Sequence, residues 1–360
     1  MKRYPLRHSR YLTAFCLLVV AFSLTVWGGD LEAKVTLEST SLEEIIVLGG
    51  EDSRIRAVMD VQERHTDDLM AEPGVVGTAT GLTDAGNPAI LVFAESFHAA
   101  QAAIIPARIE GVPVVVRITG KIRPLGNGLP IGTQRADPTS RFRRPVPIGV
   151  STGHPNITAG TIGCRVTDGS GVYALSNNHI YADENRASIG DNVLQPGPVD
   201  GGIDPDDAIG TLSDFEPIVF STFANNVIDA AIALSSPTLL KNSTPFGGYG
   251  TPKSEPIAAS VGLRVMKYGR TTSKTRGWVD AINAVVNVQY GSGVARFVDQ
   301  IVIRPGFFSS GGDSGSLIVV LRGVNARRPV GLLFAGSLEV TIANPIDAVL
   351  ERFGVTIDGD

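Results

Sequence analysis

The stretch Gly312–Ser316 reads Gly-Asp-Ser-Gly-Ser and stands directly before an apolar run, Leu317–Leu321. A serine hydroxyl is a weak nucleophile until a neighbouring base takes its proton and backbone N–H groups stabilise the developing charge. Glycines on both sides of Ser314 allow the backbone angles of a tight turn that exposes the hydroxyl. The pattern therefore predicts Ser314 as the nucleophile of a hydrolase, if a histidine and a carboxylate can reach it.

Histidine is scarce in this chain, so few residues can be the base. The candidates are His8, His65, His98, His154 and His179. His179 follows a strand-like run, 172–176, and a short polar turn, which is a position from which a side chain can reach a cleft. A neutral imidazole accepts a hydroxyl proton and later returns it to a leaving group. Taken alone, His179 is more often a loop histidine bonded to nearby backbone, but with Ser314 at a suitable spacing we predict it as the base.

Asp229 is the best candidate for the carboxylate, because it stands alone in the apolar run 226–234. A buried carboxylate is costly unless it is paired, and an imidazole N–H is a suitable partner that would fix the tautomer of the ring. A turn or helix-cap aspartate is the competing interpretation. The other acids cluster in Asp204, Asp206 and Asp207, which we expect to form a solvated loop; a calcium site is the open alternative there.

Short strand-like segments surround these three residues and must position them. The first group comprises 149–152, 161–166 and 172–176, and the second comprises 264–268, 277–288, 298–303, 317–321 and 330–334. Many short strands with Gly and Pro between them predict a mainly β fold. The order His–Asp–Ser along the chain is the one found in chymotrypsin, and its spacing suits two successive barrels.

Several stretches together resemble the trypsin-like serine proteases, and most closely the narrow-leaf-type proteins of plants and their bacterial relatives. They are 174–179, 194–198, 227–231, 267–272, 312–316 and 343–346, so the resemblance covers roughly residues 145–355. It implies two antiparallel β-barrels of the chymotrypsin type with the active site between them. It also implies catalytic roles for His179, Asp229 and Ser314, and an oxyanion hole made by the backbone N–H groups of Gly312 and Ser314.

The chain departs from the trypsin pattern at three points. Ser316 stands where many of these enzymes have glycine, and Phe308 occupies the position that often forms the floor of the specificity pocket. A preference for lysine or arginine is therefore not expected. No Ile-Val-Gly-Gly activation sequence is present, and we infer no trypsin-style zymogen cleavage.

The N-terminus resembles an export signal. Four basic residues precede a long apolar run, 11–27. The only stretch that resembles a signal-peptidase cleavage site ends at Ala33. We expect residues 1–33 to be a signal peptide or, alternatively, an uncleaved membrane anchor, and the mature protein to be periplasmic or extracellular. Removal of the leader would leave Cys164 as the only cysteine, which excludes an intrachain disulfide, and Cys164 itself is expected to be a small core residue.

Composition and charge limit the partners. The 360 residues carry a formal net charge of −5, which argues against a nucleic-acid partner. No cofactor or metal is expected for this chemistry; the expected partner is a peptide or protein substrate, and a homo-oligomer is possible. A protease-fold scaffold with little or no turnover, or an esterase that uses the same three residues, stays open.

The chain outside the protease-like part divides into two further regions. Residues 40–125 predict a small α/β domain, with a helix over 53–70, a hairpin, a short helix over 99–103 and a strand over 112–118. That domain is a propeptide-like cover, a partner-binding module or a packing domain. Residues 126–146 predict a linker and residues 147–356 the protease domain. The basic residues 264–276 are expected to be solvated charges on a hairpin, with a phosphate site as the alternative.

Overall fold

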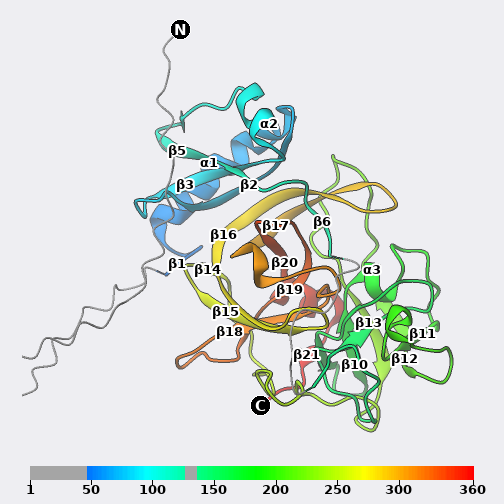
Figure 1. The fold of residues 1–360 in the computed structure, drawn as a ribbon. Coiled ribbons are helices and arrows are strands. Elements are labelled where there is room, and N and C mark those ends of the chain that lie inside the picture. The colour runs from blue at the N-terminus through cyan, green and yellow to red at the C-terminus, as the bar shows by residue number, and fades with distance from the viewer. Residues whose placement is uncertain (1–46, 126–135) are drawn as a thin grey trace, which may run out of the picture. The chain divides into compact units, whose positions relative to one another are not determined.

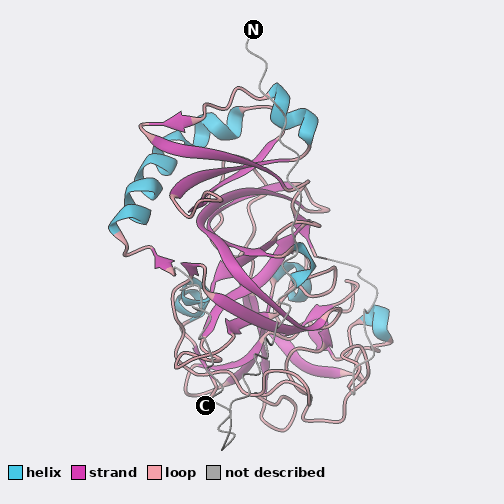
Figure 2. Cartoon of the chain, turned by 60° about the vertical axis from the view of Figure 1, so that its left-hand side comes forward, coloured by secondary structure: helices cyan, strands magenta, loops and turns pink. Residues whose placement is uncertain are grey.

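The structure is a computed structural model that describes residues 47–125 and 136–360. Strands dominate these residues, and the helices are few (Figure 2). The predicted signal peptide or anchor, residues 1–33, lies outside the described residues, and so do residues 126–135 of the predicted linker. Among the helices that are described, none has the length and apolarity needed to cross a bilayer.

The first barrel is formed by a six-stranded sheet with the strand order β11-β12-β13-β10-β9-β21. The strands are β9 (Cys164–Thr167), β10 (Val172–Ser176), β11 (Asn192–Leu194), β12 (Ala208–Phe215), β13 (Ala231–Ser235) and β21 (Thr356–Ile357). A separate two-stranded antiparallel sheet is formed by β7 (Ser151–Thr152) and β8 (Gly160–Thr161). The side chains that point inward, such as Val166, Leu175 and Ala233, are fully buried in one apolar cluster.

The second barrel closes on itself. Its strands are β15 (Arg264–Gly269), β16 (Ser273–Gln289), β17 (Val294–Arg304), β18 (Leu317–Val320), β19 (Pro329–Gly336) and β20 (Thr341–Pro345). They pair in the order β15-β18-β19-β20-β17-β16, and β16 pairs again with β15 (Figure 1). Closure gives each of the six strands a partner on both sides, although β18 pairs with β19 only as far as Leu332. The two antiparallel barrels confirm the predicted fold class, which is that of chymotrypsin.

The N-terminal segment continues the sheet of the second barrel (Figure 1). It contains β1 (Leu48–Gly49), α1 (Ser53–Ala71), β2 (Val75–Leu82), β3 (Pro88–Ala94), α2 (Phe97–Ala102), β4 (Arg108–Ile109) and β5 (Val112–Ile118). β2 pairs antiparallel with β16, while β1 pairs with β14 (Ser260–Val261). The Gln62 side chain of α1 donates to Thr78 and accepts from Thr80 of β2 inside the contact, so the helix is fixed to this sheet by polar as well as apolar groups.

A short strand, β6 (Arg123–Pro124), follows this segment and pairs antiparallel with β19 of the second barrel. The remaining elements are α3 (Asn178–Tyr181), the 3₁₀ turns η1 (Pro198–Asp200) and η2 (Gly306–Phe308), and the terminal helix α4 (Ile346–Phe353). α4 ends at Gly354, which adopts the left-handed conformation with φ 62° that glycine readily accepts.

Candidate active site

His179 lies in the first turn of α3, directly after β10, and its ring contacts Asp229. Nδ1 of His179 lies 2.6 Å from Oδ2 of Asp229, and the backbone N–H of His179 donates to Oδ1 at 3.2 Å. The side chain of Asp229 is fully buried and that of His179 is 7 % exposed. Two hydrogen bonds from one residue therefore fix the carboxylate relative to the ring, and the bond to Nδ1 leaves Nε2 as the nitrogen that can accept a proton.

Tyr290 and Asn344 complete the surroundings of Asp229. The hydroxyl of Tyr290, on the chain just after β16, donates to Oδ2 of Asp229 at 2.8 Å. The backbone N–H of Asp229 donates to the side-chain oxygen of Asn344 at 3.0 Å. Burial, together with the adjacent carboxylate, raises the pKa of Tyr290 well above its usual value, so this hydroxyl stays protonated and remains a donor.

Ser314 lies in the predicted glycine turn. Gly312 and Gly315 both have φ 91°, a conformation that a side chain would strain. The Ser314 side chain is fully buried, and its hydroxyl donates to the carbonyl of Phe334 at 3.1 Å. Within residues 47–125 and 136–360, Nε2 of His179 has no hydrogen-bond partner. The structure therefore joins His179 to Asp229 directly, but it shows no hydrogen bond from Ser314 to the imidazole.

The turn around Ser314 is held by a buried ion pair between Asp313 and Lys267. Nζ of Lys267 lies 3.2 Å from Oδ2 of Asp313, and both side chains are inaccessible to solvent. The carboxylate of Asp313 also accepts from the backbone N–H groups of Thr271, at 2.9 Å, and Ser310, at 3.0 Å. The prediction of solvated charges at 264–276 is therefore wrong for Lys267, because the carboxylate next to Ser314 provides it with a partner inside the barrel.

Arg270 is the second exception to that prediction. Its side chain is only 5 % exposed, and its Nε and Nη2 donate to the two oxygens of Asp200 at 2.6 and 2.7 Å. Its backbone N–H donates to Oγ1 of Thr161 in the first barrel at 3.0 Å. Arg270 therefore links the turn between β15 and β16 to the first barrel.

The acidic loop is also less exposed than predicted. Asp207 forms an ion pair with Arg141 at 2.7 Å and its side chain is 9 % exposed, whereas Asp204 and Asp206 are exposed. The expectation of a solvated loop is therefore wrong for Asp207. No group of metal-ligating side chains is found in the described part of the chain.

A cleft of about 280 Å³ lies beside His179. Its lining includes Ile157, Tyr290 and Pro124 of β6. Next to Pro124, the carbonyl of Leu125 accepts a hydrogen bond of 2.5 Å from the backbone N–H of Gly312, which is one of the two predicted oxyanion donors. The other, the N–H of Ser314, makes no hydrogen bond to another described residue.

Phe308, the predicted floor of the specificity pocket, is fully buried in an apolar cluster. The partly buried side chain of Leu125 packs against that same cluster. Leu125 therefore packs on an apolar core cluster of the second barrel, the one that contains Phe308.

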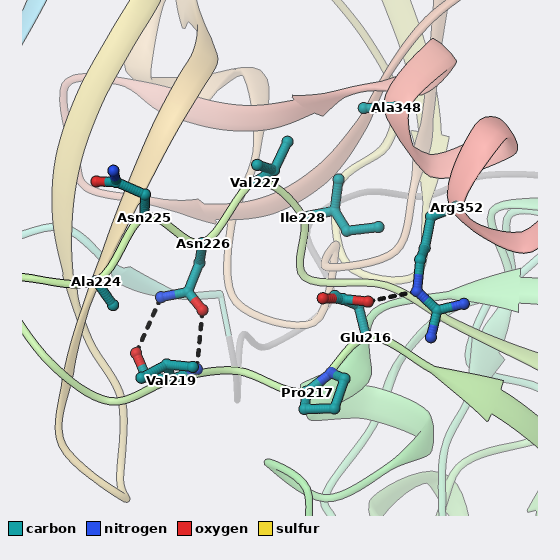
Figure 3. Close-up of a pocket in the computed structure, with 10 residues that line it drawn as sticks. All are labelled: Glu216, Pro217, Val219, Ala224, Asn225, Asn226, Val227, Ile228, Ala348 and Arg352. Atoms are coloured by element: carbon teal, nitrogen blue, oxygen red, sulfur yellow. Dashed lines mark hydrogen bonds and ion pairs between the residues drawn. The ribbon is translucent and has the colours of Figure 1, made fainter.

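A second pocket, of about 250 Å³, shares no lining residue with that cleft (Figure 3). Glu216 and Arg352 form an ion pair at its edge, and the Asn226 side chain is bonded to the backbone of Val219 (Figure 3). The side chains of Glu216, Arg352 and Asn226 thus already have partners, and none of the lining residues is a predicted site residue. The chemistry of a hydrolase is therefore better sought in the cleft beside His179.

Cys164 is not part of either site. It is fully buried on β9, and burial raises the pKa of its thiol far above the usual value. The expectation of a small core residue fits this position.

Sequence reasoning missed three residues of the site. Tyr290 stands at the end of a strand, and no sequence motif marks it. Lys267 appears in the sequence as one of several charged residues typical of a surface. The position of Leu125 depends on the pairing of β6 with β19, which is a long-range contact that no local pattern encodes.

Comparison with known protein families gives one match. Residues 252–343 match the family described as the Nal1 C-terminal domain. This stretch begins ahead of β15 and contains the second barrel up to β20, so it includes Lys267, Asp313 and Ser314. The match confirms the resemblance that the sequence motifs indicate, for this part of the chain. No curated protein matches the sequence.

Solved structures of bacterial serine proteases are similar to part of the chain. One is described as a glutamic-acid-specific serine protease that uses a histidine triad in substrate binding; it is 22 % identical, has a TM-score of 0.43, and is matched over 59 % of this chain and 100 % of its own. Protease A of Thermobifida fusca is 18 % identical and has a TM-score of 0.42; the match covers 60 % of this chain and 100 % of that protein. Nocardiopsis protease is 19 % identical and has a TM-score of 0.41; the match covers 59 % of this chain and 99 % of that protein.

Proposed function

We propose that the chain is a serine endopeptidase in which Ser314 is the nucleophile, His179 the general base and then acid, and Asp229 the residue that orients His179. The observation that carries this proposal is the 2.6 Å contact between Nδ1 of His179 and Oδ2 of Asp229, both buried at the mouth of a cleft. A carboxylate in this position stabilises the imidazolium that forms when the base accepts a proton.

Two further groups would act on the substrate carbonyl. The N–H of Gly312 already holds a carbonyl oxygen at 2.5 Å, and the N–H of Ser314 is its expected companion. Loss of one such donor typically lowers turnover about 10²–10³-fold. Ser314 needs only a rotation about its Cα–Cβ bond to leave the Phe334 carbonyl, which is a small change for a hydroxyl side chain.

The hydrolysis of unstructured peptides tests this function. We expect turnover by the wild-type chain or, because the Leu125 carbonyl occupies the N–H of Gly312, more strongly by Leu125→Asp. Ser314→Ala should abolish it, while Ser170→Ala, the same change in an exposed turn, should not alter it. The proposal fails if peptide bonds are cleaved equally well without the Ser314 hydroxyl, or are not cleaved by either folded protein.

A protease-fold scaffold with little turnover is the second candidate, and one observation favours it. The Ser314 hydroxyl is bonded to a backbone carbonyl and not to His179. A scaffold predicts that Ser314→Ala leaves the cellular phenotype unchanged when the variant accumulates normally, whereas a protease predicts its loss.

We also propose that the protein acts outside the cytoplasm. The support is the leader itself, in which basic residues precede an apolar run over 11–27. Cell fractionation with an antibody against the C-terminal half tests this location, and N-terminal sequencing shows whether the leader is cleaved after Ala33 or retained as an anchor.

A further inference from the structure

Residues Ile122–Leu125 lie along β19 beside the cleft in the manner of a bound peptide, and we propose that the chain cleaves its own backbone after Leu125. The proposal rests on the proposed function, because it uses Ser314 and His179 for the reaction. The peptide bond after Leu125 is then a modification site of the chain. The side chain of Leu125 shows which class of residue the cleft binds directly before the cleaved bond.

The main chain of this segment is bound as an added strand. β6 pairs antiparallel with β19, with Pro124 opposite Ala335 and Arg123 opposite Gly336. The pairing extends one residue further, because the N–H of Leu125 donates to the carbonyl of Phe334 at 3.4 Å. Addition of an extended segment to a strand edge is a common way to bind a peptide in a fixed register.

The carbonyl of Leu125 is held where an attacked carbonyl should be. Its oxygen accepts from Gly312 N–H at 2.5 Å. The Phe334 carbonyl that binds Leu125 N–H also accepts from the Ser314 hydroxyl, at 3.1 Å. Since both donors converge on one oxygen, the Ser314 hydroxyl lies beside the backbone of Leu125. The full burial of Ser314 agrees with a covered nucleophile.

The side chains of the segment fit the same arrangement. Pro124 lines the cleft together with His179, and Ile122 is 1 % exposed, its carbonyl accepting from the N–H of Gln289 at 2.9 Å. Leu125 packs against the apolar cluster that contains Phe308. The geometry therefore favours a medium-sized apolar residue, such as leucine, directly before the cleaved bond.

The reaction balances with water as the only co-reactant. Oγ of Ser314 bonds to the carbonyl carbon of Leu125 while His179 takes the hydroxyl proton, and the bond from that carbon to the next nitrogen breaks as His179 passes the proton to the leaving amine. Water then adds to the ester carbon, its proton passes through His179 back to Ser314 Oγ, and Leu125 leaves as a carboxylate. The new N-terminus is Gly126, which lies outside the described residues.

Both sides of the cleaved bond are anchored independently. Upstream, β2 is paired with β16 of the second barrel. Downstream, Arg141 forms an ion pair with Asp207, and the N–H of Val146 donates to the carbonyl of Leu239 at 2.8 Å. The two fragments should therefore stay together in native buffer, and separate only when the protein is unfolded.

The test follows the full chain by denaturing electrophoresis and N-terminal sequencing over time. We expect the wild-type chain to produce a fragment that begins at Gly126, at a rate that does not depend on protein concentration, while Ser314→Ala stays intact. Leu125→Asp should slow this cleavage by about 100-fold or more, since it places a charge against an apolar surface. Ile104→Asp, the same change at a side chain that is 83 % exposed, should be cleaved at the wild-type rate.

Labelling with a fluorophosphonate separates failure of this inference from failure of the proposed function. The rate at which Ser314 is labelled should be higher in Leu125→Asp than in the uncut wild-type chain, because the cleft of the variant is open. An intact wild-type chain, together with a labelled Leu125→Asp variant that cleaves peptides, would overturn self-cleavage and leave the protease standing. If neither folded protein labels at Ser314, both proposals fall.

Discussion

The ammonium of Lys267 lies 3.2 Å from Oδ2 of Asp313, the residue directly before Ser314, and neither side chain is accessible to solvent. Burial lowers the pKa of Lys267, and the adjacent carboxylate opposes that shift. The same carboxylate accepts from two backbone N–H groups of the segment 271–272. The turn that carries Ser314 is thus held by a lysine on β15.

Replacement of Lys267 by methionine should destabilise the protein strongly. The variant leaves the Asp313 carboxylate buried without its cation, which typically costs about 3–5 kcal/mol. Denaturant unfolding measures the loss, and Lys241→Met, at an exposed lysine, should change stability by no more than about 0.5 kcal/mol. Equal stabilities of the two variants would show that the ion pair does not hold the turn.

Removal of the Tyr290 hydroxyl should lower turnover modestly. Tyr290→Phe takes one of the donors from Asp229, a loss of about 1 kcal/mol or roughly fivefold in kcat, with little change in KM. Tyr249→Phe is the matched control, because among the described residues the buried Tyr249 hydroxyl has no partner. A Tyr290→Phe enzyme with wild-type kcat would mean that this hydrogen bond does not help to position Asp229.

Asp229→Asn should have a much larger effect on the same rate. The amide cannot accept from Nδ1–H with the strength of a carboxylate, so the ring is held in the wrong tautomer, and a loss of about 10⁴-fold in kcat is expected. Asp84→Asn makes the same change in an exposed turn and should leave kcat unaltered. A loss of less than tenfold in the folded Asp229→Asn protein would argue against a histidine base oriented by this acid.

Cys164 should be inert towards thiol reagents in the native protein. The thiolate is the reactive form, and burial raises the thiol pKa so far that little thiolate exists at pH 8. Peptide mapping after iodoacetamide treatment should find Cys164 unmodified before, and fully modified after, unfolding in guanidinium chloride. Rapid modification of the folded protein would show that β9 opens readily.

Local patterns predicted the parts of the molecule that depend on local chemistry. The glycines around Ser314, the helix that ends at Gly354 and the apolar strands could all be recognised because each follows from backbone preference or side-chain period. The 17-residue strand β16 and its pairing with β2 could not, since they depend on contacts between distant segments. Lys267 was misjudged for the same reason: its partner Asp313 lies far along the chain.

The pairing of β6 with β19 determines how the site should be understood. Nothing in the composition of Ile122–Leu125 shows that this segment pairs with β19 beside the cleft. Among the three roles open for the N-terminal segment, the contact of Leu125 with Gly312 favours a cover over the active site.

The most direct test of the central claim is the site of fluorophosphonate labelling in the Leu125→Asp protein, with and without a second change, His179→Ala. We expect one adduct per chain, on Ser314, and a labelling rate that falls by at least about 10³-fold when the imidazole is removed. Labelling of another serine, or a rate at Ser314 that does not depend on His179, would contradict the account.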